Sequence, residues 1–180
     1  LGAQAGLIAP DETTAAYLAS VGGDAGDWQG LRTDPNADLL AHHVFDAATL
    51  EPQVAAPHSP ANSAPVTEVP DTKVDVAYIG ACTGAKYEDL KRAARILKGR
   101  KLALDLMVAP ASKRDQDQAA SEGIMKVFED AGAEILANAC GICAGYGSNR
   151  LGEDVTCISS TARNFQGRMG AASSRVWLGS

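Results

Sequence analysis

The sequence lacks any long apolar run and is poor in basic and aromatic side chains. No apolar stretch approaches the ~20 residues that a membrane-spanning helix needs. Lys and Arg number 16 against 22 Asp and Glu, which gives a net charge of −6, and aromatic residues make up 5% of the 180 residues. A nucleic-acid binder needs a local excess of basic side chains that can follow the phosphates. We therefore expect neither a membrane nor a nucleic acid as a partner.

Cysteine is also scarce, with four residues in the chain. Four cysteines are too few to form a disulfide framework, and a chain of 180 residues can bury a hydrophobic core without one. The N-terminus has no basic-then-apolar leader, so nothing marks the chain for export and we expect a cytoplasmic protein. Clustered cysteines in a reducing compartment indicate metal binding or redox chemistry. Because the first residue is Leu1 rather than Met, we expect a part of a longer protein.

Three of the cysteines lie in two glycine-flanked turns. Cys140 and Cys143 stand three positions apart in the stretch Ala-Cys-Gly-Ile-Cys-Ala-Gly-Tyr-Gly (139–147). Cys82 lies in a second turn, Gly-Ala-Cys-Thr-Gly (80–84). A pair at this spacing can bind one metal centre, and a third cysteine in a similar turn strengthens that interpretation.

The C-terminal two thirds of the chain alternate between strand and helix patterns, which is typical of an α/β fold. Compact runs rich in β-branched and apolar residues predict strands at 74–79, 101–108, 134–137 and 155–159. Apolar residues at helical spacing predict helices at 86–98 and from Ser112 to about residue 128, the second split or kinked at Gly123. This alternation predicts a three-layer α/β/α architecture with a mainly parallel sheet.

The N-terminal third has weaker patterns. Asp11 is expected to cap a short helix, and residues 43–46 read as a short strand. The proline-rich stretch 56–65 has no apolar period and is interpreted as a connector. We therefore predict that residues 1–66 form a small partial α/β segment of a preceding domain plus a connector, and that residues 67–180 form the α/β domain that carries the cysteines.

The predicted sheet brings the two cysteine turns to one edge. Cys82 follows the first predicted strand, Cys140 follows the third, and the segment with Arg163 and Arg168 follows the fourth. Ligands of parallel sheets gather at the carboxyl ends of the strands. A guanidinium is always charged and binds a carboxylate through two parallel hydrogen bonds. The two arginines are therefore candidates for binding a carboxylic acid.

The sequence leaves three interpretations of the cysteines open. A structural zinc site needs a fourth ligand, which Cys157 or His58 would supply, although Cys157 by itself reads as a small buried apolar residue. A thioredoxin-like redox pair is expected near the first strand rather than late in the domain. An iron–sulfur cluster on three thiolates leaves one iron open, and such an iron polarises a hydroxyl or carboxylate. The last interpretation suits a hydroxylated di- or tricarboxylic acid as substrate.

The motifs resemble those of the aconitase superfamily, over nearly the whole chain. Ile-Gly-Ala-Cys-Thr (79–83) with Glu-Asp-Leu (88–90) is similar to the first cluster-cysteine motif, and Ala-Cys-Gly-Ile-Cys (139–143) to the paired-cysteine motif. Arg-Asn-Phe-Gln-Gly-Arg (163–168) is similar to the substrate-arginine motif. Residues 7–14 and 51–60 resemble the end of one family domain and the start of the next. The resemblance is strongest to the branch of 3-isopropylmalate dehydratase large subunits, with homoaconitase and dimethylmalate dehydratase as relatives.

The resemblance implies an aconitase-type iron–sulfur domain. It implies a 4Fe-4S cluster with one open iron on Cys82, Cys140 and Cys143, with Arg163 and Arg168 facing the substrate carboxylate. The implied activity is that of a hydro-lyase or isomerase that dehydrates and rehydrates a hydroxy di- or tricarboxylic acid. A 3-isopropylmalate dehydratase-like role in leucine biosynthesis fits best. The alternatives are homoaconitase, aconitase or dimethylmalate dehydratase activity, or a non-catalytic zinc or redox module that uses Cys157 as fourth ligand.

The resemblance also implies a partner. The general base of this family is a serine on a swivelling domain, which in the dehydratase branch is a separate small subunit, and nothing in this chain matches it. We therefore expect a hetero-oligomer and no turnover by this chain alone. Gly84 and Ala162 stand where the family usually has asparagine, and Gln4 stands where aconitases proper have glutamate. The loss of two amide side chains near the cluster is expected to alter substrate choice or cluster lability.

Overall fold

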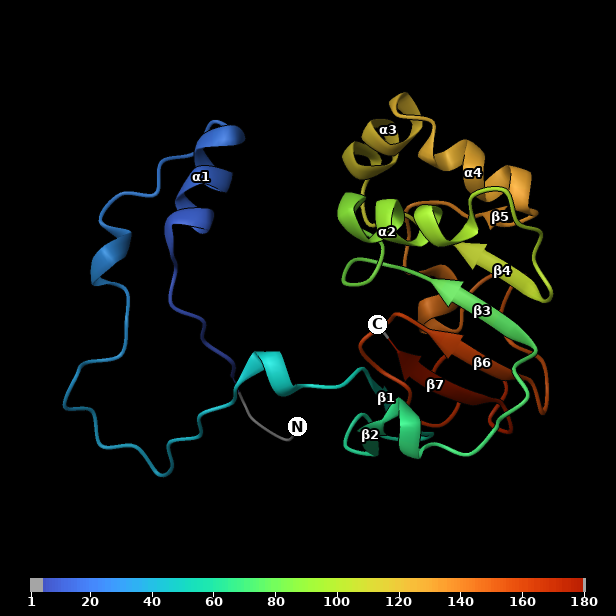
Figure 1. The fold of residues 1–180 in the computed structure, drawn as a ribbon, viewed down its shortest axis with the longest axis horizontal. Helices are drawn as coiled ribbons and strands as arrows, with labels where there is room; N and C mark the ends of the chain where they lie inside the picture. The colour runs from blue at the N-terminus through green and yellow to red at the C-terminus, as the bar shows by residue number, and fades with distance from the viewer. Residues whose placement is uncertain (1–4, 180) are drawn as a thin grey trace. The chain divides into compact units, whose positions relative to one another are not determined.

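A computed structural model describes residues 5–179 and divides the chain after Thr49 into two units (Figure 1). Gln4 lies outside the described residues. The sequence predicted the division near residue 66, later than the structure has it. The difference arises because residues 53–55, just before the predicted connector, and residues 63–65, within it, form strands that belong to the sheet of the C-terminal unit. No helix in the described part of the chain is long and apolar enough to cross a bilayer.

The C-terminal unit is built on a seven-stranded sheet with the strand order β2-β1-β7-β6-β3-β4-β5. The strands are β1 (Gln53–Ala55), β2 (Ser63–Pro65), β3 (Val76–Ile79), β4 (Asp105–Val108), β5 (Glu134–Ile135), β6 (Thr156–Ser159) and β7 (Arg175–Gly179). The five strands from β7 to β5 run parallel, and β1 and β2 extend the sheet antiparallel at the β7 side. The predicted α/β class with a mainly parallel sheet is therefore confirmed.

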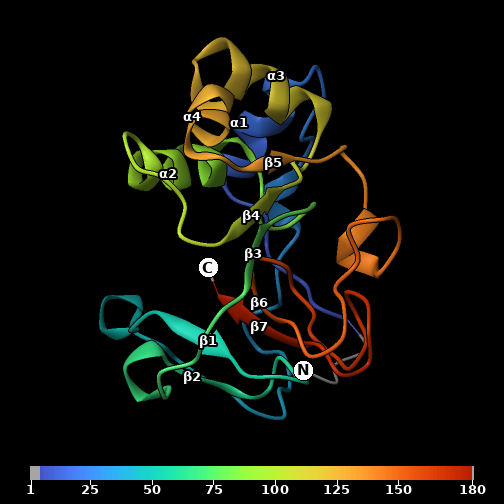
Figure 2. The ribbon, with the colours of Figure 1, turned by 90° about the vertical axis from the view of Figure 1, so that its right-hand side faces the viewer.

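Alternate side chains of the central strands supply two cores, one on each face of the sheet. Helices α2 (Tyr87–Leu97), α3 (Lys113–Ser121) and α4 (Ile124–Ala131) cover one face, where Leu90 and Phe128 are fully buried with Leu106 and Val108. The other face holds Tyr78, Met107, Cys157 and Val176. It is covered by irregular segments and the short 3-10 helix η4 (Gly141–Ala144), on the side opposite to α2 in Figure 2.

The helix cap at Ser112 and the helix break at Gly123, both predicted from the sequence, are confirmed in the C-terminal unit. The Ser112 hydroxyl accepts a hydrogen bond from the amide of Asp115 at 3.1 Å and caps α3. Gly123 has a left-handed conformation, with φ of 73°, and separates α3 from α4. The helix predicted at 86–98 is α2. Strand β7, which closes the parallel sheet near the C-terminus, was not predicted.

The N-terminal unit has one α-helix, α1 (Glu12–Ser20), and two 3-10 turns, η1 (Trp28–Gly30) and η2 (Ala47–Thr49). The carboxylate of Asp11 accepts a hydrogen bond from the amide of Thr14 at 2.8 Å, so the predicted cap is confirmed. The strand predicted at 43–46 is wrong, because these residues are irregular and have no pairing strand. None of residues 5–49 is buried.

Candidate functional site

Three segments that carry predicted site residues leave the same edge of the sheet. The last residues of β3 and β4 pair directly, Ile79 with Val108, and Val108 pairs with Ile135 at the end of β5. Tyr78 pairs with Ser159 at the end of β6. The strands therefore end level with one another. The segments that follow β3, β5 and β6 carry Cys82, the Cys140–Cys143 pair and the two arginines, as the parallel topology predicted.

The Cys82 turn is held at both ends by one serine from a neighbouring segment. The Ser160 hydroxyl accepts a hydrogen bond from the amide of Gly80 at 3.0 Å and donates one to the carbonyl of Gly84 at 2.9 Å. A Cβ atom at Gly84 would overlap the carbonyl oxygen of Ser160. The turn thus packs directly on the start of the arginine segment, with an approach that only glycine permits. The asparagine expected here from the resemblance would not fit this conformation.

The Cys140–Cys143 turn is anchored by a single apolar side chain. Ile142 lies in η4 and is buried in the core beneath the turn, whereas Cys140 is exposed and Cys143 is partly buried. Gly145 ends η4 with φ of 73°, and its amide donates a hydrogen bond to the carbonyl of Ile142 at 2.9 Å. A Cβ at Gly145 would lie 3.2 Å from the carbonyl oxygen of Arg168. The cysteine pair is therefore packed against the arginine segment as well.

The Tyr78 side chain is buried beside both cysteine turns. Its side chain is 1% exposed, and its hydroxyl has no hydrogen-bond partner within residues 5–179. Burial raises the pKa of this hydroxyl, and negative charge on Cys143, Cys140, Cys157 and Cys82 raises it further. A Cβ at Gly80 would overlap the Tyr78 ring near its hydroxyl oxygen, and Tyr78 packs in one apolar cluster with Ile142 and Cys143, so its side chain adjoins both cysteine turns. Sequence reasoning assigned no role to Tyr78, since a tyrosine in an apolar strand pattern is ordinary core.

The arginine segment is fixed by a buried asparagine between its two cations. The Asn164 side chain is fully buried, and its amide nitrogen donates hydrogen bonds to the carbonyls of Ala56 at 2.9 Å and Val176 at 3.0 Å. Arg163 is exposed next to it. The guanidinium carbon of Arg168 lies 5.3 Å from the centre of the Phe165 ring, and its Nε is buried with no hydrogen-bond partner in the part of the chain that the structure describes. The role of Asn164 was not predicted.

Neither arginine is neutralised within the described residues. The ion pairs found in residues 5–179 are all made by lysines: Lys73, Lys91, Lys113 and Lys126. Two guanidinium groups on one segment, beside the cysteine turns, are suited to an anionic ligand such as a carboxylate.

Comparison with known proteins identifies the family. Residues 1–180 match the aconitase family (aconitate hydratase). The chain belongs to the aconitase family. The resemblance seen in the cysteine and arginine motifs is therefore confirmed.

The similar members of this family carry dehydratase and homoaconitase names. The chain is 40% identical over 181 residues to "3-isopropylmalate dehydratase large subunit 2" of Archaeoglobus fulgidus, a match that covers 99% of this chain and 43% of the relative. It is 39% identical over 170 residues to "Probable methanogen homoaconitase large subunit" of Methanosarcina mazei, covering 94% and 43%. The chain thus spans less than half the length of these relatives.

The thiols fit the donor set of an aconitase-family cluster. Cys82, Cys140 and Cys143 are free thiols with access to solvent, on two turns that share Tyr78 as a neighbour. The described residues include no group of three or more His, Cys, Asp or Glu side chains already arranged to hold a metal ion. The three thiols therefore fit a cluster by the chemistry of their sulfur atoms and by their location on two turns at the same edge of the sheet. Soft thiolates are the ligands that iron–sulfur clusters require.

Cys157 differs from the other three cysteines. Its side chain is 0% exposed in the apolar core below the sheet, and burial raises the pKa of its thiol to about 12. The thiolate is the form that binds metal, so burial disfavours coordination at this position. These observations favour Cys157 as a packing residue over the alternative in which it is a fourth ligand.

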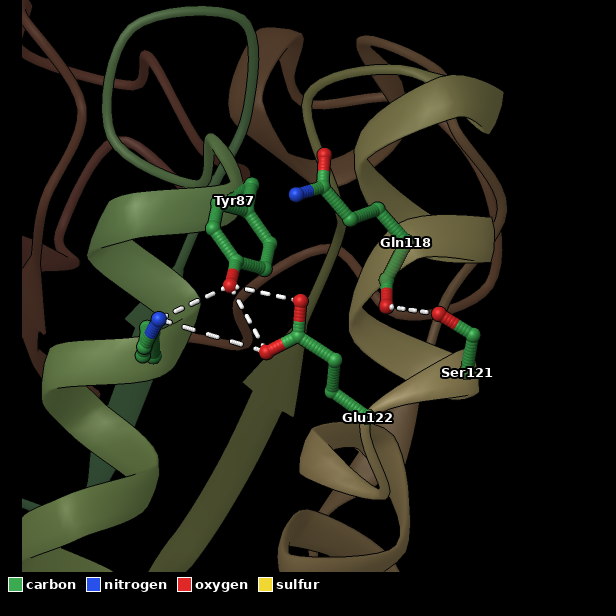
Figure 3. Close-up of polar contacts among 5 residues, drawn as sticks. Tyr87, Gln118, Ser121 and Glu122 are labelled. Carbon is green, nitrogen blue, oxygen red and sulfur yellow. Dashed lines mark hydrogen bonds and ion pairs between the residues drawn. The ribbon is translucent and has the colours of Figure 1, made fainter.

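A polar network holds α2 in place after the Cys82 turn (Figure 3). The Tyr87 hydroxyl donates to the carboxylate of Glu122 at 2.7 Å and accepts a hydrogen bond from Nζ of Lys91 at 2.9 Å. This hydrogen bond raises the pKa of Lys91. The Tyr87 amide also donates to the carboxylate of Asp115 at 3.0 Å. The contacts connect the first turn of α2 to both ends of α3, which fixes the helix that leads away from the cysteine turn.

Proposed function

We propose that this chain is the cluster-bearing part of a hydro-lyase large subunit that dehydrates and rehydrates a hydroxy di- or tricarboxylic acid. The observation that carries the proposal is the location of three free thiols in two turns at one sheet edge, beside two arginines that have no carboxylate partner among the described residues. The names of the relatives support 3-isopropylmalate dehydratase-like chemistry in leucine biosynthesis. Homoaconitase, aconitase and dimethylmalate dehydratase activities are the alternatives within the same reaction class.

We assign the ligand role to Cys82, Cys140 and Cys143, which would hold a 4Fe-4S cluster with one open iron. When bound, this cluster supplies a Lewis acid that polarises the hydroxyl group of the substrate. Arg163 and Arg168 would bind the substrate carboxylate and orient the carbon that loses its proton. Removal of that proton and departure of the hydroxyl as water give the unsaturated acid, and addition of water reverses the step.

The base that accepts the proton is expected outside this chain. We propose a small swivel-domain subunit as the partner that supplies it, which agrees with the "large subunit" names of the relatives. The active form is then a hetero-oligomer, and this chain alone should not turn over substrate. A cytoplasmic location is part of the same proposal, because an open iron is readily lost in an oxidising compartment.

Activity measurement of the complete protein with its small subunit tests the proposal. After anaerobic reconstitution with iron and sulfide, it should dehydrate a 2- or 3-hydroxy diacid. Cys140→Ser should abolish the activity, and Arg168→Lys should raise KM, because a lysine cannot form the paired hydrogen bonds of a guanidinium. Full activity of the Cys140→Ser variant would overturn the assignment.

A further inference from the structure

Tyr78 carries a buried polar group that the fold itself does not use. The side chain is 1% exposed, and the hydroxyl is enclosed without a hydrogen-bond partner among the described residues. Buried hydroxyls in folded proteins are almost always paired, because an unpaired one loses its bonds to water without replacement. An orphaned hydroxyl therefore indicates that a partner joins it in another state of the protein.

The Tyr78 side chain packs against both cysteine turns. A Cβ at Gly80, two residues before Cys82, would overlap the Tyr78 ring close to its hydroxyl oxygen. On the other side, Tyr78 packs with Ile142 and Cys143 in one apolar cluster. A cavity of about 170 Å³ is bounded by Tyr78 and the turn that includes Gly141. One phenol group thus contacts both segments that carry the proposed ligands.

We propose that the Tyr78 hydroxyl donates a hydrogen bond to a sulfur of the cluster bound by Cys82, Cys140 and Cys143, and that Tyr78 is a positioning residue for this cluster. The inference rests on the proposed function. A phenol is a hydrogen-bond donor at neutral pH, and the sulfurs of a cluster are acceptors that carry negative charge. Hydrogen bonds to the sulfurs raise the reduction potential of such clusters. They also stabilise the bound state.

Removal of this hydroxyl should have different effects on the free and loaded protein. In the free protein, Tyr78→Phe removes an unpaired polar group from the core, so the melting temperature should stay the same or rise. In the loaded protein, the same substitution removes a hydrogen bond to the cluster. Iron should then be lost to a ferrous chelator about three- to tenfold faster under anaerobic conditions, and the reduction potential should fall. A residue that only fills the core would show neither change in the loaded form.

Tyr146→Phe is the matched control. Tyr146 borders the same cavity and follows the Cys140–Cys143 turn, but it is 72% exposed. This variant should lose iron at the wild-type rate. The complete large subunit would be reconstituted with iron and sulfide as wild type, Tyr78→Phe, Tyr146→Phe and Cys140→Ser. Melting would be measured before loading, and iron loss and potential afterwards.

The outcomes separate the two proposals. If wild type and Cys140→Ser both take up no iron, the proposed function fails and the role of Tyr78 fails with it. If wild type binds iron, Cys140→Ser does not, and Tyr78→Phe loses iron at the wild-type rate, only the role of Tyr78 is overturned. A lower melting temperature of free Tyr78→Phe would show that the hydroxyl already has a partner, which would also overturn it.

Discussion

The hydroxyl of Ser160 connects both ends of the Cys82 turn, and its removal should release that turn. Ser160→Ala deletes the hydrogen bonds to the amide of Gly80 and the carbonyl of Gly84. Each is worth roughly 0.5–1.5 kcal/mol, so the free energy of unfolding should fall by about 1–3 kcal/mol. For a unit of this size, the melting temperature should fall by roughly 3–10 °C.

Hydrogen exchange gives the more specific measurement for this variant. The Gly80 amide loses its acceptor, so it should exchange with solvent clearly faster in Ser160→Ala than in wild type, and iron uptake by the chain should decrease. Ser174→Ala is the control, because Ser174 is a buried serine whose hydroxyl donates to the carbonyl of Ala171 at 2.7 Å. The control should lose stability without faster exchange at Gly80. Unchanged exchange at Gly80 in Ser160→Ala would refute the reasoning.

Three further expectations concern other parts of the same site. Gly84→Asn should destabilise the C-terminal unit by about 1–3 kcal/mol in a denaturant melt, because its Cβ would overlap the Ser160 carbonyl oxygen; equal stability would show that the turn can rearrange. Asn164→Ala should lower the free energy of unfolding by about 2–4 kcal/mol, because it removes the hydrogen bonds that the Asn164 side chain donates to the carbonyls of Ala56 and Val176; a loss no larger than that of an alanine substitution at an exposed site would contradict this. Cys157 should resist alkylation at neutral pH while the other three thiols react. Its folded-state pKa is raised from 9.0 to about 12, so its contribution to stability is complete below pH 9 and is lost as pH rises through about 12. Rapid labelling of all four thiols in the folded chain would contradict its burial.

The parallel core was predictable because its signals are local. Compact β-rich runs separated by amphipathic segments indicate strands and crossover helices, and Ser112 and Gly123 mark helix ends through their own backbone chemistry. Strands β1 and β2 have three residues each and contain or adjoin proline, so they are too short to show a detectable alternation of apolar and polar residues. Their pairing with each other and with β7 depends on a surface formed by distant segments. The opposite error occurred at residues 43–46, where an apolar run had no partner strand.

The part of the site that could be predicted is the part whose chemistry follows from the residue type alone. A pair of cysteines flanked by glycines has few other uses, and neither do two arginines five positions apart. These motifs could therefore be recognised in the sequence. The role of Ser160 could not be predicted, because it depends on hydrogen bonds to a turn that is 80 residues away in the sequence. The role of Tyr78 could not be predicted for a similar reason, since only the folded structure shows that its side chain adjoins both turns and that its hydroxyl is unpaired among residues 5–179.

Iron and sulfide content after anaerobic reconstitution tests the central claim most directly. The complete large subunit should bind one 4Fe-4S cluster as wild type and as Cys157→Ala, and it should bind none as Cys140→Ser. Iron content that is unchanged in Cys140→Ser, or lost in Cys157→Ala, would contradict a cluster held by Cys82, Cys140 and Cys143.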